Sequence, residues 1–427
     1  MPALAQLSAR GSVARTSAQV PARPQRATVA CRAASQKNSS YEEARNPLEK
    51  AAIGIATAAA VMMGTFSPLV LVPPPAEAIL VASDPVKDAG AILRNALPIN
   101  NKPIRQVQAS LEDITGALKQ PPAQALAQTS RDVRSAADVL SRQRDAIIKD
   151  FAPEKKAAAI EALEKLADTL TEFQAVVGAK DRAAVPIKQK EALAYLNTIE
   201  EAMVKGFPFE IPKEYQDRPL LLGRSTLEMK IRSPNTPEGP QTFVQKIVLD
   251  GYNAPVSAGQ FLDLVLRGFY DNTEIQRADG FVVQFGDPEG PAEGFVDPKT
   301  NEIRRVPFEM RVQNDKEPIY DFTLEDLGRV NEQDLGRVNE QPVLPFNAYG
   351  TMAWARNEFE NNSASSQVFF LLKESELTPT GSNLLDGRFA VFGYITENKD
   401  VLSEMRVGDK IEYIKVLDGK ENLKNGP

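Results

Sequence analysis

The chain contains no histidine and only one cysteine, Cys31, among its 427 residues. The missing histidine excludes Ser-His-Asp and Cys-His catalysis, and it excludes any metal site built on histidine ligands. Disulfides, thiol chemistry and thiolate metal sites all depend on the single cysteine. We therefore expect no metal and no cofactor, and any chemistry must use arginine, carboxylates, amides, hydroxyls or the shape of a binding surface.

An excess of basic residues is also absent, because the chain has 50 Lys and Arg against 57 Asp and Glu, a net charge of −7. A nucleic-acid-binding protein needs a basic face, so we expect no nucleic-acid partner. The hydrophobic share of 42% and the charged share of 25% are typical of a globular protein. The length allows two or more domains.

Acidic residues are missing from residues 1–40, which carry several arginines and many Ser and Ala. This composition is typical of an organelle transit peptide, although a disordered basic arm is the alternative. An apolar run, AAIGIATAAAVMMGTFSPLVLV, follows at residues 51–72 and ends in PPPAEA. The run could span a bilayer, but its prolines, the small-x-small triplet ending at Ala78 and the lack of a basic cluster afterwards favour cleavage.

A transit peptide followed by a signal-like segment is the address of a protein of the chloroplast thylakoid lumen. We predict a transit peptide at residues 1–50 and a lumen signal at 51–78, both removed. The mature protein then has no stable membrane span.

Residues 79–205 have the apolar spacing of helices. In SRDVRSAADVLSRQRDAIIKDF, one helix face is formed by Val133, Ala137, Leu140, Ile147 and Phe151. Prolines divide the region into segments, and an antiparallel helical bundle is the simplest way to cover several apolar stripes. A coiled-coil dimer is the alternative, but the heptads are often interrupted. A linker at residues 206–222 is too apolar to be a free tether, so we expect it to lie on a domain surface.

From residue 223 the hydrophobic period changes to two, which predicts a largely antiparallel β domain with few helices up to residue 420 and a tail at 421–427. An insertion at 288–344 contains DLGRVNEQ twice in tandem, at 326–333 and 334–341. Two short units build no solenoid, so we interpret the repeat as a recent duplication in a surface loop or an error in the gene sequence. Glu358 and Glu360 are interpreted as solvated surface carboxylates, not as a metal site.

The stretch QRADGFVVQFGD, residues 276–287, reads as a buried strand that contains an amide, Gln284, with Arg277 just upstream. A buried amide must find hydrogen-bond partners. Taken alone, the stretch fits a satisfied core glutamine and an arginine at the strand end. Two further stretches change this interpretation, MAWAR followed by SSQVFFLL at 352–372, and LLDGRFAVFG at 384–393.

The three stretches in this order resemble the cyclophilins, which are peptidyl-prolyl isomerases with a closed eight-stranded barrel capped by two helices. The whole chain is similar to the large multidomain thylakoid-lumen cyclophilins of plants and green algae. The resemblance implies an α+β multidomain fold, with an N-terminal antiparallel helical bundle followed by a C-terminal cyclophilin-like closed antiparallel β-barrel with capping helices. It also implies a role in folding, assembly and repair of photosystem II.

By resemblance, Arg277 is the catalytic cation and Gln284 the amide that orients it. The resemblance also assigns the substrate-binding groove, in which a pocket holds the proline ring and other positions lie on its rim. These residues are Phe281, Val282, Trp354, Gln367, Phe369, Leu384, Leu385 and Phe389. Such a site needs no nucleophile or proton shuttle, because it lowers the rotational barrier of an X-Pro bond by preorganised electrostatics.

The chain departs from the family pattern at several of these positions. Only Ala278, Asp279 and Gly280 lie between the arginine and the phenylalanine, one residue fewer than usual, and Asp279 could pair with Arg277. Gln276 and Phe389 stand where the family has histidines, and Trp354 and Leu384 where active members have an asparagine and a tryptophan. The departures predict a weak, covered or lost isomerase activity.

Three functions remain open from the sequence. The first is a binding protein that holds lumenal segments of photosystem II subunits, in which the bundle and linker could cover the groove by an intramolecular bundle–cyclophilin contact. The second is an active isomerase acting on lumenal proteins, and the third is a regulator of a thylakoid protein phosphatase.

Overall fold

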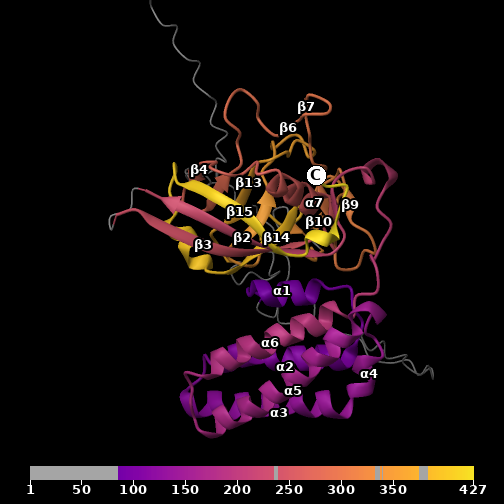
Figure 1. Ribbon diagram of the computed structural model, residues 1–427, viewed down its shortest axis with the longest axis vertical. Helices are drawn as coiled ribbons and strands as arrows, with labels where there is room; N and C mark the ends of the chain where they lie inside the picture. The colour runs from indigo at the N-terminus through magenta and orange to yellow at the C-terminus, as the bar shows by residue number, and fades with distance from the viewer. Residues whose placement is uncertain (1–84, 235–238, 332–336, 339, 375–382) are drawn as a thin grey trace, which may run out of the picture. The chain divides into compact units, whose positions relative to one another are not determined.

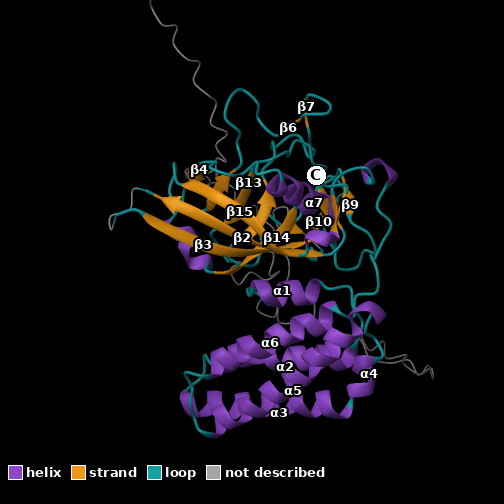
Figure 2. Cartoon of the chain, in the orientation of Figure 1, coloured by secondary structure: helices purple, strands orange, loops and turns teal. Residues whose placement is uncertain are grey.

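The computed structural model describes residues 85–427 except for 235–238, 332–336, 339 and 375–382 (Figure 1). The predicted targeting segments, residues 1–78, lie outside these described residues. None of the described helices is both long enough and apolar enough to cross a membrane. Helices fill the first part of the described chain and strands dominate the second (Figure 2).

The helical part contains a bundle in which α2 packs against α3 and α6, and α5 packs against the same two helices. The helices are α1 (Ala89–Ala96), α2 (Lys102–Ala117), α3 (Pro122–Arg142), α4 (Arg144–Ile148), α5 (Lys156–Gly178) and α6 (Val185–Glu201). Short connections turn each long helix back along the previous one, so the apolar stripes meet in one core. Its fully buried members include Ile104, Leu111, Leu163, Phe173 and Leu196. The predicted helical bundle is confirmed.

Proline and asparagine mark the beginnings of the bundle helices. Pro122 is the first residue of α3, where a missing N–H costs nothing because the first turn has no intrahelical acceptor. Asn101 caps α2, since its side-chain oxygen accepts a hydrogen bond from the Ile104 N–H at 3.0 Å.

Helix α1 does not share the core of the bundle. Its apolar side chains, among them Ile92, Leu93 and Ala96, belong to the same buried cluster as the barrel residues Leu227 and Leu249. The predicted helical region of 79–205 therefore contains a first helix that packs on the barrel. An amphipathic pattern shows that a helix has an apolar face, but it does not show which core that face joins.

An eight-stranded antiparallel sheet forms the second part, in the order β15-β2-β3-β14-β12-β13-β5-β4. These strands are β2 (Arg224–Ser233), β3 (Gln241–Asp250), β4 (Ile275–Ala278), β5 (Val282–Phe285), β12 (Thr351–Trp354), β13 (Val368–Leu371), β14 (Val391–Glu397) and β15 (Lys410–Asp418). A bridge between Glu274 and Lys410 brings the two edge strands together. The Ile275 N–H also donates to the Asp409 carbonyl at 2.8 Å. The sheet therefore curls into the predicted barrel, which leaves its edges paired.

A second α-helix, α7 (Pro255–Leu266), also packs on the barrel and is buried over almost its whole length. Short 3-10 segments occur at η1 (Pro153–Lys155), η2 (Lys213–Tyr215), η4 (Lys399–Glu404) and η5 (Lys420–Asn422). The Phe261 ring of α7 lies 5.6 Å from that of Phe392 in β14, so the helix closes the barrel core. The N-terminus of α7 is capped by Glu309, whose carboxylate accepts from the N–H groups of Val256 at 3.2 Å and Ser257 at 2.7 Å.

Short two-stranded ladders build the linker end, the tail and the insertion. They are β1 (Leu220–Leu221) with β16 (Leu423–Lys424), β6 (Val296–Asp297) with β7 (Glu302–Ile303), β8 (Glu309–Met310) with β9 (Ile319–Tyr320), and β10 (Val330–Asn331) with β11 (Arg337–Val338). The last ladder joins the two copies of DLGRVNEQ, because β10 belongs to the first copy and β11 to the second. Arg329 of the first copy also forms an ion pair with Glu340 of the second.

Candidate functional site

The residues that the sequence singles out are brought together by the register of four strands. Arg277 in β4 is directly opposite Gln284 in β5, which is opposite Phe369 in β13. Phe369 is in turn opposite Ala353 in β12. Paired residues of an antiparallel sheet point to the same face, so these four side chains form one row. Their neighbours along each strand, such as Phe370 and Met352, point the other way into the barrel core.

A chain of side-chain hydrogen bonds fixes the amide in this row. Gln284 Nε2 donates to Gln367 Oε1 at 2.9 Å, and Gln367 Nε2 donates to Asp287 Oδ1 at 3.1 Å. Asp287 is a carboxylate and can only accept, so Gln367 must turn its Nε2 toward it. The Gln367 oxygen is then left to accept from Gln284, which fixes the orientation of the second amide as well. Gln284 thus contacts Gln367, another of the predicted groove residues, and its role in orienting Arg277 stays a prediction.

The arginine of the row is held by its own neighbour, Asp279. Arg277 Nη2 lies 2.5 Å from Asp279 Oδ2, and Nε donates to the same oxygen at 2.6 Å. The other carboxylate oxygen accepts hydrogen bonds at 3.0 Å from the N–H groups of Phe281 and Val282. Burial alone would raise the pKa of the Asp279 carboxyl, but the two backbone donors and the guanidinium outweigh burial and lower the pKa.

Aromatic side chains pack around Phe369, which is buried at 6% exposure. The Phe346 ring stacks on it with centroids 6.1 Å apart and planes 6° from parallel, and the Phe389 ring meets it edge-on at 5.6 Å. Leu385 is half-buried against the same core. These rings provide the apolar wall that a proline ring requires. Phe346 is a buried member of this aromatic cluster that the sequence did not reveal.

A buried carboxylate, Asp386, positions this wall. It accepts hydrogen bonds from the Phe346 N–H at 2.8 Å and the Asn383 N–H at 2.9 Å, while Asn383 Nδ2 donates to the Phe346 carbonyl at 3.1 Å. Burial raises the pKa of Asp386 to about 6. These hydrogen bonds hold the loop that carries Leu384 and Leu385 against Phe346, whose ring stacks on Phe369. In the sequence, Asp386 is visible only as part of the LLDGRF pattern.

Three other predicted groove residues differ in how far they are exposed. Phe281 is 42% exposed and Leu384 is 71% exposed, so both side chains are accessible, and their place on the groove rim stays a prediction. Val282 is buried and lies next to Phe281 at the start of β5.

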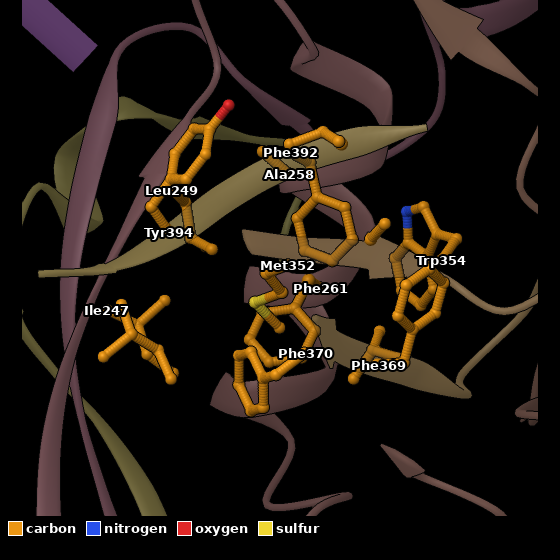
Figure 3. Close-up of a cluster of buried hydrophobic side chains, with 14 of the residues drawn as sticks. Ile247, Leu249, Ala258, Phe261, Met352, Trp354, Phe369, Phe370, Phe392 and Tyr394 are labelled. Carbon is orange, nitrogen blue, oxygen red and sulfur yellow. The ribbon is translucent and has the colours of Figure 1, made fainter. Parts of the chain in front are cut away.

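Trp354 does not lie on the groove. Its side chain is 2% exposed, and its ring stacks on Phe392 at 4.8 Å and meets Phe261 at 6.3 Å inside the barrel (Figure 3). The assignment of Trp354 to substrate binding is therefore wrong. One residue decides the face of a strand, and here Ala353 points to the groove while Trp354 points to the core. Its buried Nε1 has no hydrogen-bond partner among the described residues.

The linker packs on the insertion and not on the groove. The Tyr215 hydroxyl donates to the Asp321 carboxylate at 2.8 and 2.9 Å, and the Tyr215 ring lies 4.9 Å from that of Tyr320. Arg218 donates to the Arg305 carbonyl. Over the part of the chain that the structure describes, these contacts leave the groove row uncovered by the linker, so the idea that the linker occludes the site is not supported.

Contacts between the helical part and the barrel gather around Arg224. Its guanidinium pairs with the fully buried Asp250 at 2.7 Å and with Glu201 of α6 at 3.3 Å, and it donates to the Leu93 carbonyl of α1. Neither partner helix contributes to the groove row. In the described ranges, no group of three or more Cys, Asp or Glu side chains is placed to hold a metal ion.

Comparison with known proteins agrees with this architecture. Residues 88–204 match the family "Peptidyl-prolyl cis-trans isomerase CYP38-like, PsbQ-like domain", and residues 244–420 match the cyclophilin type peptidyl-prolyl cis-trans isomerases. The chloroplastic peptidyl-prolyl cis-trans isomerase CYP38 of Arabidopsis thaliana is 49% identical over 407 residues, covering 93% of this chain and 91% of its own.

Two further relatives cover most of the chain. A protein of Synechocystis sp. named as a thylakoid lumen peptidyl-prolyl cis-trans isomerase is 42% identical over 81% of this chain and 86% of its own. The chloroplastic CYP37 of Arabidopsis thaliana is 29% identical over 82% of this chain and 74% of its own. The chain thus belongs to the cyclophilin-type peptidyl-prolyl isomerase family, in the group of the chloroplast thylakoid lumen that carries a PsbQ-like helical domain ahead of the cyclophilin domain.

Proposed function

We propose that the chain is a thylakoid-lumen cyclophilin that binds proline-containing segments of photosystem II subunits during folding, assembly and repair, with an isomerase activity that its own sequence restrains. The role in photosystem II rests on the family resemblance. The binding of an X-Pro segment is supported by the row of Arg277, Gln284 and Phe369 and by the aromatic wall around it.

Each part of the row has a task in X-Pro binding. The Phe369 pocket takes the proline ring, and Gln284 with Gln367 lines the path of the peptide backbone. Rotation about the X-Pro bond crosses a barrier of about 18–20 kcal/mol, and a cation that follows the rotating carbonyl lowers it. Arg277 is the side chain of the row that could do this.

The observation that carries the proposal is the ion pair between Arg277 and Asp279, at 2.5 Å. A guanidinium that is already paired with a carboxylate gains less from a developing charge, because its own positive charge is partly neutralised. The pocket and amide chain are intact while the cation is withdrawn, so binding is retained more fully than catalysis.

The test uses the predicted mature chain, residues 79–427, and a synthetic tetrapeptide containing Ala-Pro. Chemical-shift changes on titration measure binding, and NMR exchange spectroscopy measures isomerisation. We expect binding that Phe369→Ala abolishes and Arg277→Ala preserves, together with slow exchange. Absence of any Phe369-dependent binding would overturn the proposal.

An active isomerase is the second candidate, and the unbroken hydrogen-bond chain from Gln284 through Gln367 to Asp287 favours it. Rapid exchange in the same experiment, lost in Arg277→Ala, would establish this function instead. Regulation of a thylakoid phosphatase has no separate structural support among the described residues and stays a prediction from the resemblance.

A further inference from the structure

Two neighbouring segments of the barrel domain carry exposed apolar side chains. Phe359, in the loop at 356–363, is 90% exposed, and Phe322 and Leu327 in the insertion are 54% and 44% exposed. We name these three side chains the aromatic shelf. Single exposed apolar residues are ordinary, but a group of them on adjoining segments marks a binding surface.

Hydrogen bonds hold the two segments of the shelf side by side. Asn361 Nδ2 donates to the Asp321 carbonyl at 3.0 Å and to Asp326 Oδ2 at 2.7 Å, and Asn362 Nδ2 donates to Asp321 Oδ1 at 2.8 Å. Asp321 immediately precedes Phe322, and Asp326 immediately precedes Leu327. The insertion and the loop therefore carry their exposed apolar side chains on adjoining segments.

The loop that carries Phe359 is fixed before any partner arrives. The Asn357 N–H donates to Ser363 Oγ at 2.7 Å, and Ser363 Oγ donates to the Glu360 carbonyl at 2.7 Å. Arg356 Nη1 donates to the carbonyls of Asn357 at 2.8 Å and Glu358 at 3.1 Å. A side chain on a preorganised loop loses little further entropy on binding, which is a property of interface hot spots.

The shelf is joined to the proline pocket by a short path. The Arg356 guanidinium lies 5.1 Å from the Phe389 ring, and that ring lies 5.6 Å from Phe369. Arg356 Nε also donates to the Arg388 carbonyl at 2.9 Å. From the Arg356 guanidinium, which contacts the Glu358 carbonyl next to Phe359, to the Phe369 ring, these two steps span no more than about 11 Å, which an extended peptide covers in about three to four residues.

The rim of the shelf is acidic, and this decides the chemistry of the partner. Exposed carboxylates surround the apolar side chains, namely Glu325, Asp326, Glu358 and Glu360. Glu325 pairs with Arg388 at 3.3 Å. In contrast, Glu358 and Glu360, which flank Phe359, form no salt bridge in the described part of the chain, although the charge of Glu358 acts on Arg356. A purely apolar partner would remove them from water without compensation, whereas a lysine or arginine would neutralise them and could also lie on the Phe359 ring.

We infer that the aromatic shelf binds a basic, apolar segment of the client, about three to four residues from the proline that enters the pocket. The inference rests on the proposed function, because it extends the same binding site. It identifies the client class as a segment in which Lys or Arg alternates with apolar residues next to an X-Pro bond. Phe359, Glu358 and Glu360 then determine specificity, and the pocket supplies the proline contact.

The test compares synthetic peptides that share one Ala-Pro unit in a Ser/Gly chain. One set carries Lys-Leu-Lys-Phe four residues from the proline, on the N-terminal or C-terminal side, and the other carries it twelve residues away. A third peptide has no basic segment. Affinities for residues 79–427 are measured by calorimetry at low and high salt. The variants are Phe359→Ala, the double variant Glu358→Gln/Glu360→Gln, and the matched control Ile187→Ala, which changes a 69% exposed side chain on α6.

We expect one of the near-spaced peptides to bind about tenfold more tightly than its far-spaced counterpart. Both shelf variants remove this difference, Ile187→Ala preserves it, and high salt reduces it. Equal binding of near and far peptides, or an undiminished difference in Phe359→Ala, overturns the inference. A dimer that forms with increasing concentration and is lost in Phe359→Ala would also overturn it, because a second copy would then occupy the shelf.

The peptide without a basic segment separates this inference from the proposed function. If it binds in a Phe369-dependent manner while spacing has no effect, the shelf fails and the groove stands. If neither it nor the others bind through Phe369, the proposed function itself fails.

Discussion

Arg277 and Asp279 form an ion pair in which Nη2 and Oδ2 are 2.5 Å apart, although only one residue separates them in the chain. The same carboxylate is fixed by the N–H groups of Phe281 and Val282, so it cannot follow the guanidinium if a peptide draws it away. The turn that shortens the connection between β4 and β5 thus also supplies the acid that restrains the arginine. The turn between β4 and β5 therefore explains both the short spacing between Arg277 and Phe281 and the pairing of Arg277 with an acid.

Replacing this acid should release the arginine. Asparagine in Asp279→Asn keeps a side-chain oxygen for the two backbone donors but carries no charge. We expect the rate of Ala-Pro exchange, measured by NMR, to rise about tenfold or more, since a preorganised donor is worth two to three orders of magnitude in rate. Asp138→Asn, at a 67% exposed position on α3, is the control and should leave the rate unchanged. An unaltered rate in Asp279→Asn would show that the ion pair does not limit turnover.

The amide of the row can be tested in the same background. In Asp279→Asn/Gln284→Glu, the donor to Gln367 Oε1 is lost and a carboxylate stands directly opposite Arg277. We expect the gain in exchange rate to disappear, because the new carboxylate takes over the pairing with the guanidinium. The midpoint of thermal unfolding should change little. If the double variant exchanges Ala-Pro as fast as Asp279→Asn does, the side chain at position 284 does not control the charge of Arg277.

Removing the buried ion pair of Arg224 should lower the free energy of unfolding. Arg224→Met leaves the fully buried Asp250 without its cation, and we expect the free energy of unfolding in urea to fall by about 3–5 kcal/mol. Adding Asp250→Asn should recover part of this loss, because the uncompensated charge is then removed. Arg142→Met, which breaks an exposed pair with Asp138, should cost less than about 1 kcal/mol. If Arg224→Met and Arg142→Met lower the free energy of unfolding equally, the pair of Arg224 with Asp250 does not behave as a buried ion pair.

Stability should depend on pH through Glu200 in α6. Burial raises the pKa of this carboxyl to about 8, and neither of its oxygens has a hydrogen-bond partner among the described residues. The charged groups that face it are Arg105, Arg94, Glu112 and Arg224. The folded pKa lies above the unfolded one, so the unfolded chain binds fewer protons between these values and stability falls as pH rises.

The variant Glu200→Gln should remove this dependence. The slope of the unfolding free energy between about pH 5 and pH 8 should become flatter by up to about 1.4 kcal/mol per pH unit. Urea unfolding at several pH values measures the slope. Glu161→Gln, at an exposed position of α5, is the control and should leave that slope unchanged. An identical slope in Glu200→Gln and the parent would show that Glu200 does not carry the effect.

The order of the domains and the centre of the site could be predicted from the sequence. The change of hydrophobic period near residue 223 separated helices from strands, because side-chain burial repeats every 3.6 residues in one and every two in the other. Arg277 and Gln284 flank one tight turn, so their approach is a local property of two strands. Phe369 belonged to a motif specific enough to place it beside them.

Other features depended on contacts between distant segments. Phe346 stacks on Phe369 and is tied to Asp386, but neither contact leaves a periodic mark in the sequence. The face of Trp354 could not be assigned because the pairing of β12 with β14 shifts between Met352 and Ala353, and a shift of one residue exchanges the two faces of a strand.

By itself, the sequence determined the kinds of elements, their order and the chemistry that is possible without histidine, because these follow from composition and local spacing. Only the tertiary structure decided which core α1 joins, which side of the barrel Trp354 faces and which segment the linker covers. Apolar burial has no direction of its own, so an amphipathic segment accepts any apolar partner, and the packing of the whole chain selects one.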